Sequence, residues 1–263
     1  MRAMNIAATG MLAQQTNVEV ISNNIANMNT TGFKRQRAEF QDLLYQNISR
    51  PGVASSDSGT VVPNGVQIGL GVRTASTYRI MEQGNLSSTE NPYDLAVQGK
   101  GFFRVLLPSG DEAYTRAGAF SVSSEGQLVT PAGYAVQPAI VIPREAVEVS
   151  IDKTGQVQVM LSGQTTPQTV GQIELATFFN EAGLSAMGDN LFLETDASGS
   201  PQTGTPGSEG YGTLLQGFIE TSNVDPVSEI TSLISAQRAY EMNSKVITTT
   251  DEMMAMTANL SRS

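Results

Sequence analysis

Two amphipathic stretches lie at the two ends of the chain. In the first stretch, positions recur every seven residues in two rows, Met4, Met11, Val18 and Ile25 in one and Ala7, Gln14, Ile21 and Met28 in the other. A heptad pattern of this kind predicts a helix with one apolar stripe, here over residues 3–28. Asn29 and Gly32 are expected to end it, because both residue types tolerate left-handed backbone.

The second amphipathic stretch begins at Asp225-Pro226, where a proline in the first turn favours a helix start. Two adjacent rows again have a spacing of seven, Leu233, Tyr240, Ile247 and Met254 in one and Ala239, Val246, Met253 and Leu260 in the other. A helix is therefore expected over residues 226–260.

The middle of the chain has a different pattern, with alternating apolar residues and frequent Gly and Pro. Turn sequences at residues 108–111, 131–133 and 152–155 are each flanked by strand-like runs. The predicted hairpins pair 102–107 with 112–116, 127–129 with 134–136, and 147–151 with 156–160. Many short strands predict an all-β domain, either a sandwich or an irregular barrel.

The predicted fold class is α+β. We expect a discontinuous helical domain over residues 1–45 and 220–263, an extended linker over 46–65 and a β domain over 66–219. Residues 47–65 and 196–212 are rich in Gly, Pro, Ser and Asp or Thr, which indicates loops.

The apolar stripes of the two helices need a surface to cover, because an isolated amphipathic helix is only marginally stable in water. The two helices can pack on each other as an antiparallel pair, or the stripes can be reserved for neighbouring subunits. The pattern alone leaves both possibilities open.

Composition excludes several functions. The 263-residue chain has no His and no Cys, which removes His-based acid–base catalysis, Ser-His and Cys-His nucleophiles, disulfides and the usual zinc sites. A net charge of −10 argues against nucleic acid as a partner. We expect no catalytic, cofactor-binding or metal site, and hence no enzymatic activity.

The remaining candidates for chemistry are weak. Gly69-Leu70-Gly71 and Gly99-Lys100-Gly101 lack the third glycine and following helix of a phosphate loop. Asp111 and Glu112 are adjacent and would face opposite sides of a strand. Lys34, Arg35 and Arg37 form a basic cluster, read by default as a solvated face and alternatively as a docking patch for a neighbouring copy.

No stretch is apolar and long enough to suggest a membrane span, and the N-terminal residues lack the apolar core of a signal peptide. If the chain is exported, we expect export without a cleaved signal peptide.

Several separate stretches together resemble the flagellar axial proteins, which form rod, hook and hook-associated structures. They are residues 22–35, 97–105, 114–120, 126–130, 216–224 and 236–243. The residues that carry the resemblance most strongly are Asn27, Thr30, Gly32, Phe33, Lys34, Arg35, Gly99, Gly101, Phe102, Gln237, Arg238 and Tyr240. Total length and the extension at 47–65 favour the distal-rod branch of this family.

The resemblance implies a helical homopolymer in which the terminal helices pair and line a tube. Polymer contacts would come from Met4, Ala7, Met11, Val18, Ile21, Ile25 and Met28 of the first helix, and from Leu233, Ala239, Tyr240, Val246, Ile247, Met253, Met254 and Leu260 of the second. Contacts between protofilaments would come from Phe40, Leu43, Leu44 and Tyr45.

The resemblance further implies a location in the basal body, from periplasm to outer membrane. Expected partners are copies of the chain itself, proximal rod proteins, the hook protein, the P- and L-ring proteins and the flagellar type III export apparatus. The alternatives are a proximal rod or hook subunit, a secreted β-rich adhesin, or a carboxylate-based glycan hydrolase.

Overall fold

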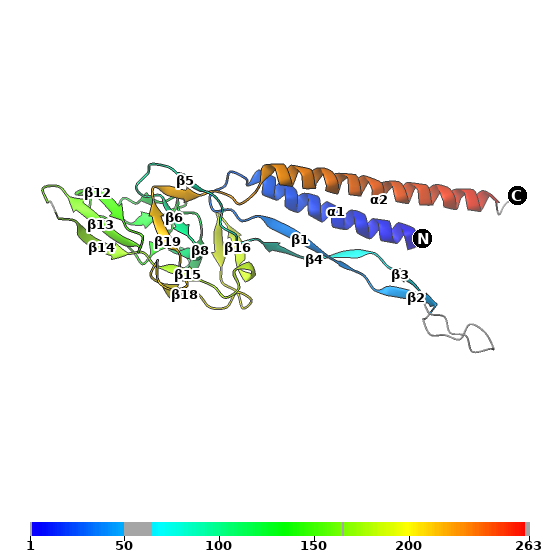
Figure 1. The fold of residues 1–263 in the computed structure, drawn as a ribbon, viewed down its shortest axis with the longest axis horizontal. Helices are drawn as coiled ribbons and strands as arrows, with labels where there is room; N and C mark the ends of the chain where they lie inside the picture. The colour runs from blue at the N-terminus through cyan, green and yellow to red at the C-terminus, as the bar shows by residue number, and fades with distance from the viewer. Residues whose placement is uncertain (1, 50–64, 165, 261–263) are drawn as a thin grey trace. The chain divides into compact units, whose positions relative to one another are not determined.

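The computed structural model describes residues 2–49, 65–164 and 166–260, and it divides the chain into two compact units. The first unit comprises residues 1–25, 36–78 and 226–263, and the second comprises residues 26–35 and 79–225. Both terminal helices and the many-stranded region between them are present, which confirms the predicted α+β class (Figure 1).

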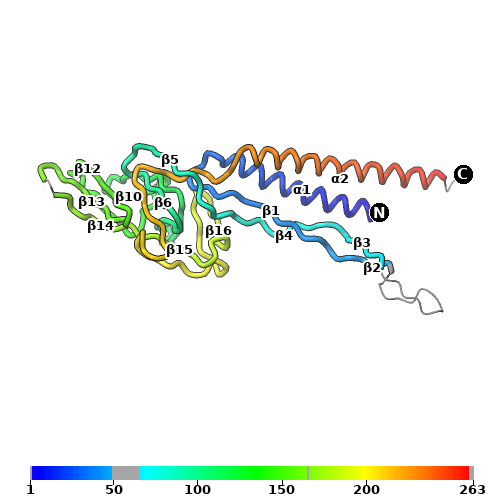
Figure 2. The backbone as a smooth tube through the Cα atoms, in the orientation of Figure 1, coloured from blue at the N-terminus to red at the C-terminus, as the bar shows by residue number. Residues whose placement is uncertain are grey.

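The first unit contains two long helices, α1 (Arg2–Ala26) and α2 (Pro226–Leu260). They run side by side in opposite directions (Figure 2). The observed bounds agree with the predicted ones within two residues, and those of α2 are identical to the prediction. The proline at the start of α2 explains why its first residue could be located from sequence.

A two-stranded arm completes the first unit. The strand β1 (Gln36–Asp42) pairs with β4 (Val72–Arg79), and β2 (Tyr45–Ser49) pairs antiparallel with β3 (Val66–Gly69). The expected loop at 47–65 is therefore wrong at its first three residues, which belong to β2. Residues 50–64, the main part of the expected linker, lie outside the described residues.

The described part of the second unit is built mainly from β-strands, which form four sheets. The largest sheet has nine strands, β7 (Phe102–Leu106), β8 (Glu112–Thr115), β9 (Ser121–Val122), β10 (Leu128–Val129), β11 (Ala135–Gln137), β15 (Leu175–Thr177), β16 (Ser185–Gly188), β17 (Leu191–Leu193) and β18 (Gln202–Gly204). A three-stranded sheet contains β12 (Ala146–Ile151), β13 (Gln156–Leu161) and β14 (Gln168–Gln172).

Two strand pairs and one short helix complete this unit, β6 (Leu95–Gln98) with β19 (Thr213–Gln216), β5 (Leu86–Ser88) with β20 (Phe218–Glu220), and the 3₁₀ helix η1 (Glu181–Gly183). All three predicted hairpins are confirmed by their pairings. The expected loop at 196–212 is wrong where β18 forms, because this polar strand gains its hydrogen bonds at the edge of β15.

Two apolar clusters hold the second unit together, and two neighbouring phenylalanines of β7 belong one to each cluster. Successive side chains of a strand point to opposite faces. Phe103 packs edge-to-face on Phe120 in the larger core, with ring centroids 5.0 Å apart. Phe102 lies in the smaller cluster with Phe178 and Phe192.

The units do not follow the expected domain boundaries throughout. Residues 66–78 belong with the helices, because β4, which follows residues 47–65 in the sequence, pairs with β1, which precedes them. Residues 26–35 and 220–225 belong with the β-rich unit. These two short segments are assigned to the β-rich unit because they make hydrogen bonds within it.

Candidate assembly surfaces and the signature residues

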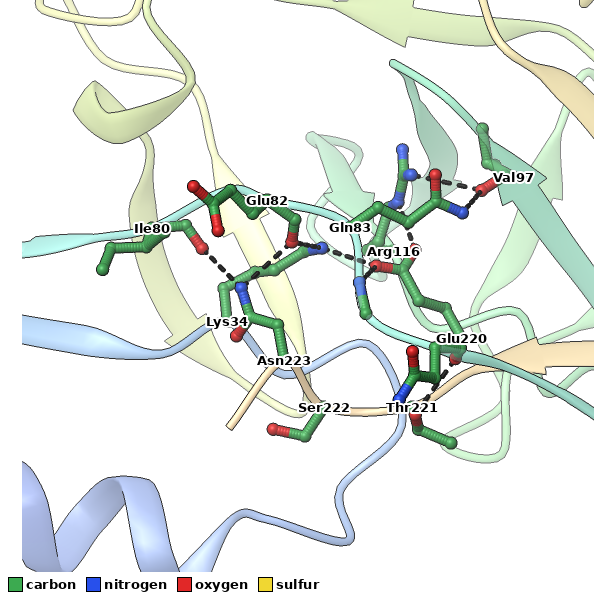
Figure 3. Close-up of polar contacts among 12 residues, drawn as sticks. Lys34, Ile80, Glu82, Gln83, Val97, Arg116, Glu220, Thr221, Ser222 and Asn223 are labelled. Carbon is green, nitrogen blue, oxygen red and sulfur yellow. Dashed lines mark hydrogen bonds and ion pairs between the residues drawn. The ribbon is translucent and has the colours of Figure 1, made fainter. Parts of the chain in front are cut away.

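Three charged residues from distant parts of the sequence meet inside the second unit (Figure 3). Glu220 accepts a hydrogen bond from Lys34 Nζ at 2.5 Å through Oε1, and from Arg116 Nε at 2.6 Å through Oε2. All three side chains are buried. We call Lys34, Arg116 and Glu220 the buried triad.

Backbone groups saturate the triad. Arg116 donates further hydrogen bonds to the carbonyl oxygens of Val97, Gly99 and Gly101. Lys34 Nζ also donates to the Glu82 carbonyl at 2.8 Å, and the Gly84 amide donates to Glu220 Oε1 at 2.9 Å. Buried charges are tolerated only when they are paired and hydrogen-bonded in this way.

The triad explains the family-like residues around it. The amide of Gly32 donates to the Glu220 carbonyl at 2.8 Å, and the amide of Arg35 donates to Asn223 Oδ1 at 2.7 Å. Asn223 in turn donates to the carbonyls of Ile80 and Glu82 (Figure 3). The triad and these bonds tie segments from the N-terminal, middle and C-terminal thirds of the chain into one interior site.

Burial lowers the pKa of Lys34 below its ordinary value, while the Glu220 carboxylate acts in the opposite direction. Because Lys34 is buried, it is not available to an exposed docking patch, and that reading of the basic cluster is wrong for this residue. Arg37 is exposed. Its Nη2 atom donates a hydrogen bond to Glu39 Oε1 at 2.8 Å, and its guanidinium lies over the ring of Tyr78.

The other residues of the resemblance have simpler places. Thr30 and Asn27 form a turn after α1, with the Thr30 amide donating to the Asn27 carbonyl at 3.1 Å. Gly99 and Gly101 have positive φ values, 106° and 134°. Phe33 is half-buried, Phe102 is buried, and Gln237, Arg238 and Tyr240 are exposed on α2.

Polar side chains mark the contact between α1 and α2. Asn24 Nδ2 donates to Glu229 Oε2 at 3.1 Å and to the Gln36 carbonyl at 2.8 Å. Both Asn24 and Glu229 are buried. Glu229 lies in the first turn of α2, where the helix dipole favours a negative charge.

A second contact fixes the register of the pair. A Cβ added to Gly10 would lie 2.9 Å from Asn243 Nδ2, so the helices approach closely there. The step of fourteen residues from Asn24 back to Gly10 matches the step of fourteen from Glu229 to Asn243. The contact row on α2 is therefore Glu229, Ala236, Asn243 and Thr250, spaced by seven and buried or half-buried.

The predicted contact residues of α1 are mostly covered within the chain. Ala7 and Ile21 are buried, and Met4, Met11, Val18 and Ile25 are half-buried. Met28 lies beyond the end of α1 and is exposed.

The predicted contact residues of α2 divide into two groups. Leu233, Ala239, Ile247 and Met254 are half-buried, whereas Tyr240, Val246, Met253 and Leu260 are exposed. Met242 and Met256 are also exposed, and together with Val246, Met253 and Leu260 they follow a heptad spacing outside the row that faces α1. We call these five residues the second stripe.

The arm exposes apolar side chains as well. Leu44 is 83% exposed, and Tyr45, Ile48 and Val66 are exposed on the β2–β3 part of the arm. Phe40 and Leu43 are half-buried. A two-stranded ribbon with this much apolar exposure is typical of a surface that another molecule covers.

The described residues show little that points to catalysis. They contain no group of three or more acidic residues arranged to hold a metal ion. No helix in the described part of the chain is long and apolar enough to cross a membrane. Asp111 and Glu112 lie at the β7–β8 turn, where both side chains are exposed.

Sequence reasoning missed the groups that join distant segments. Arg116 and Glu220 were not singled out, and the α2 row Glu229, Ala236, Asn243 and Thr250 was passed over in favour of a more apolar one. A signal existed in the second case, because the polar row keeps a spacing of seven and continues the heptad of Leu233.

Three protein-family models match the chain. They describe the "Flagella basal body rod protein" at residues 4–34, the "Flagellar hook protein FlgE/F/G D1 domain" at 96–159 and the "Flagellar basal body rod FlgEFG protein C-terminal" at 215–260. The triad residues Lys34, Arg116 and Glu220 fall one in each matched segment.

Curated relatives cover nearly the whole chain. A "Flagellar basal-body rod protein FlgG" of Caulobacter vibrioides is 64% identical over 260 residues, 99% of both chains. A protein of the same name from Bacillus subtilis is 41% identical over all of both chains. A "Flagellar basal-body rod protein FlgF" of Caulobacter vibrioides is 34% identical over 99% of this chain and 95% of that one.

Proposed function

Because the chain belongs to the family of flagellar basal-body rod proteins, we propose that it polymerises into the distal, torque-transmitting part of the rod. It is a structural subunit of the flagellar rod. The finer assignment to the distal part rests on identity with relatives named FlgG, which exceeds the identity with FlgF.

The observation that carries polymerisation is the second stripe on α2. Its residues have the spacing of a helix–helix contact, yet α1 covers a different row. An exposed apolar stripe of this kind promotes aggregation of a monomer, whereas in a polymer a neighbouring copy of the chain can bury it.

The length of α2 supports the same proposal. From the register of Asn24 with Glu229, Arg2 at the start of α1 lies opposite Asp251, so residues 252–260 extend past α1. Nine residues of helix are about 14 Å long. Met253, Met256 and Leu260 on this extension have no α1 beside them, and we assign them to contacts between copies.

We assign the arm to contacts between protofilaments. Leu44, Tyr45 and the half-buried Phe40 and Leu43 would pack on a neighbouring copy and resist shear. Deletion of residues 47–65 should then give a bent polymer in place of a straight rod. Straight, rigid rods from the deletion would contradict this role.

The proposal extends to partners and location. Rod membership supports assembly with other flagellar components, which we take to be proximal rod proteins, the hook protein, the P- and L-ring proteins and the type III export apparatus. The rod would lie in the basal body, which spans periplasm to outer membrane. The subunit would be exported without a cleaved signal peptide, bind no nucleic acid and have no enzymatic activity.

Electron microscopy of the purified protein at rising concentration tests polymerisation. The full chain should form tubes, and a chain lacking residues 1–30 and 226–263 should remain monomeric. A sharper variant, V246Q/M253Q/L260Q, keeps helix-favouring residues while replacing three of the five apolar side chains of the second stripe.

This triple variant should retain its helical circular dichroism and fail to form tubes. The control V147S removes from β12 an apolar side chain that is 73% exposed, at least as exposed as Val246 and Met253, and should assemble normally. Tubes from the triple variant at the parent's concentration would show that the second stripe is not a polymer contact.

A further inference from the structure

One aromatic side chain of the second unit points into solvent although the residue before it is buried in a core cluster. Phe179 lies between β15 and η1 and is fully exposed. Its neighbour Phe178 is buried, with its ring 4.8 Å from Tyr114 and 6.0 Å from Phe102 in edge-to-face contacts. Phe178 therefore anchors the backbone that presents Phe179 to solvent.

The residue on the other side of Phe179 is held too. Asn180 Nδ2 donates to the Ala197 carbonyl at 3.0 Å, and the Gly183 amide donates to the Asn180 carbonyl at 3.1 Å. A phenyl ring on a fixed base loses little conformational entropy on binding, which is the property of an interface anchor.

The first unit contains a groove of matching character between α1 and the arm. Its volume is about 440 Å³, and its apolar walls are Leu12, Ala13, Leu43 and Val72. Leu12 is 64% exposed, so this apolar surface is open to a second molecule.

The groove is a built feature of the unit. The Val72 amide donates to Thr9 Oγ1 at 3.3 Å, and Thr9 Oγ1 donates to the Ile6 carbonyl at 2.8 Å. The first bond joins the arm to α1, and the second fixes the Thr9 hydroxyl that accepts it.

Charge favours this groove over two other surface pockets as the place for Phe179. Glu181 lies two residues after Phe179, and Arg73 lies at the groove, although Glu19 lies there too. The pocket beside β5 and β12 contains Glu90 and Glu148, and the pocket beside Tyr134 contains Asp189, each without a basic residue.

We propose that Phe179 of one copy inserts into the groove formed by α1 and the arm of a second copy. The contact joins two different surfaces, so each copy offers one anchor and one groove, and repetition generates an open helical polymer when the rotation between copies does not close a ring. The inference rests on the proposed polymerisation and adds a specific contact to it.

Crosslinking in rods isolated from cells tests the contact, and the absence of Cys from the chain makes the test clean. A chain carrying both F179C and L12C, treated with a short bis-maleimide, should give a ladder of dimers, trimers and higher oligomers. Either substitution alone should leave monomers. The pair F179C and V147C, which joins two exposed positions outside the groove, should also leave monomers.

Intact rods without a ladder would overturn the contact and leave polymerisation standing. A faster-migrating monomer would also overturn it, because it would show crosslinking within one chain. Failure of the unsubstituted chain to appear in rods would overturn polymerisation and this contact together.

A double-mutant cycle on rod stability tests the charge pair. E181Q and R73Q should each lower the dissociation midpoint of isolated rods, and the double variant should be no weaker than the weaker single one. The control cycle of E181Q with R37Q should be additive. Additive effects in the first cycle would remove the Glu181–Arg73 pairing and, with it, the reason for preferring this groove.

Discussion

Lys34 and Glu220 are 186 residues apart in the sequence, and their Nζ and Oε1 atoms lie 2.5 Å apart in the interior of the second unit. With Arg116 they join three segments that separate family models match. The residues that make the chain resemble a rod protein thus include ones that join distant segments inside the β-rich unit.

Substitution of Glu220 should be severely destabilising. E220Q keeps the shape of the side chain but leaves Lys34 and Arg116 as buried cations without a counter-charge. Breaking a buried pair in this way costs about 3–5 kcal/mol. Chemical denaturation should show this loss, whereas E209Q, which alters an exposed carboxylate of the same unit, should change stability by less than about 0.5 kcal/mol.

The damage from E220Q should depend on pH. The Glu220 charge raises the pKa of Lys34, so its removal lets burial lower that pKa further. Between the lowered pKa of the folded variant and the unfolded value of 10.5, the unfolded chain holds a proton that the folded variant has released, so the stability of the variant rises with pH in that window. The gap between E220Q and the parent should therefore narrow between pH 7 and pH 10, and a constant gap would contradict this account.

Gly32 should resist substitution for two reasons. Its φ is +69°, and a Cβ added there would lie 2.7 Å from the Ala117 amide nitrogen. G133A provides the control, because Gly133 also has a positive φ, +89°, but open space around it. G133A should cost about 1 kcal/mol from backbone strain, and G32A should cost clearly more in the same denaturation experiment. Equal losses would mean that Ala117 moves aside.

Tyr114 makes the β-rich unit sensitive to alkali. Burial, with a smaller effect from the Glu112 charge, raises the pKa of Tyr114 to about 12. Between pH 10 and pH 12 the unfolded chain releases this proton while the folded chain keeps it, so stability falls as pH rises. Y114F should lose less thermal stability than the parent between pH 9 and pH 11.5. A parallel loss in the two proteins would mean that Tyr114 ionises normally.

Local patterns were sufficient for the two helices and for the three predicted hairpins. The proline at residue 226 located the start of α2, and turn residues such as those at 152–155 located the hairpins. The strand β18 at the edge of the sheet could not be predicted from its own sequence, because this polar segment is a strand only through its pairing with β15. The resemblance to rod and hook proteins identified the family correctly, and the comparisons confirm it.

The interior of the candidate site was harder to predict, and the reason is physical. Hydrophobic periodicity selects rows by apolarity, whereas α1 and α2 meet through Asn24, Glu229 and Asn243. Lys34 looked like part of a solvated basic cluster because a charged residue is rarely buried without a partner. Its partner Glu220 could not be inferred from a residue 186 positions away.

The Gly10–Asn243 approach offers a direct test of the helix pair. G10A should gain helix propensity worth about 1 kcal/mol, but the added Cβ would lie 2.9 Å from Asn243 Nδ2 and cancel part of the gain. In an N243A background that obstacle is absent. G10A should therefore be more stabilising in N243A than in the parent, and denaturation of the four proteins measures the difference as a coupling energy.

The control cycle combines G10A with M242A. Met242 is exposed and lies outside the contact row, so the two effects should be additive. A coupling of zero between G10A and N243A would mean that the helices do not approach at this register. It would also remove the argument that residues 252–260 extend past α1, because that argument rests on the same alignment of Gly10 with Asn243 and Asn24 with Glu229.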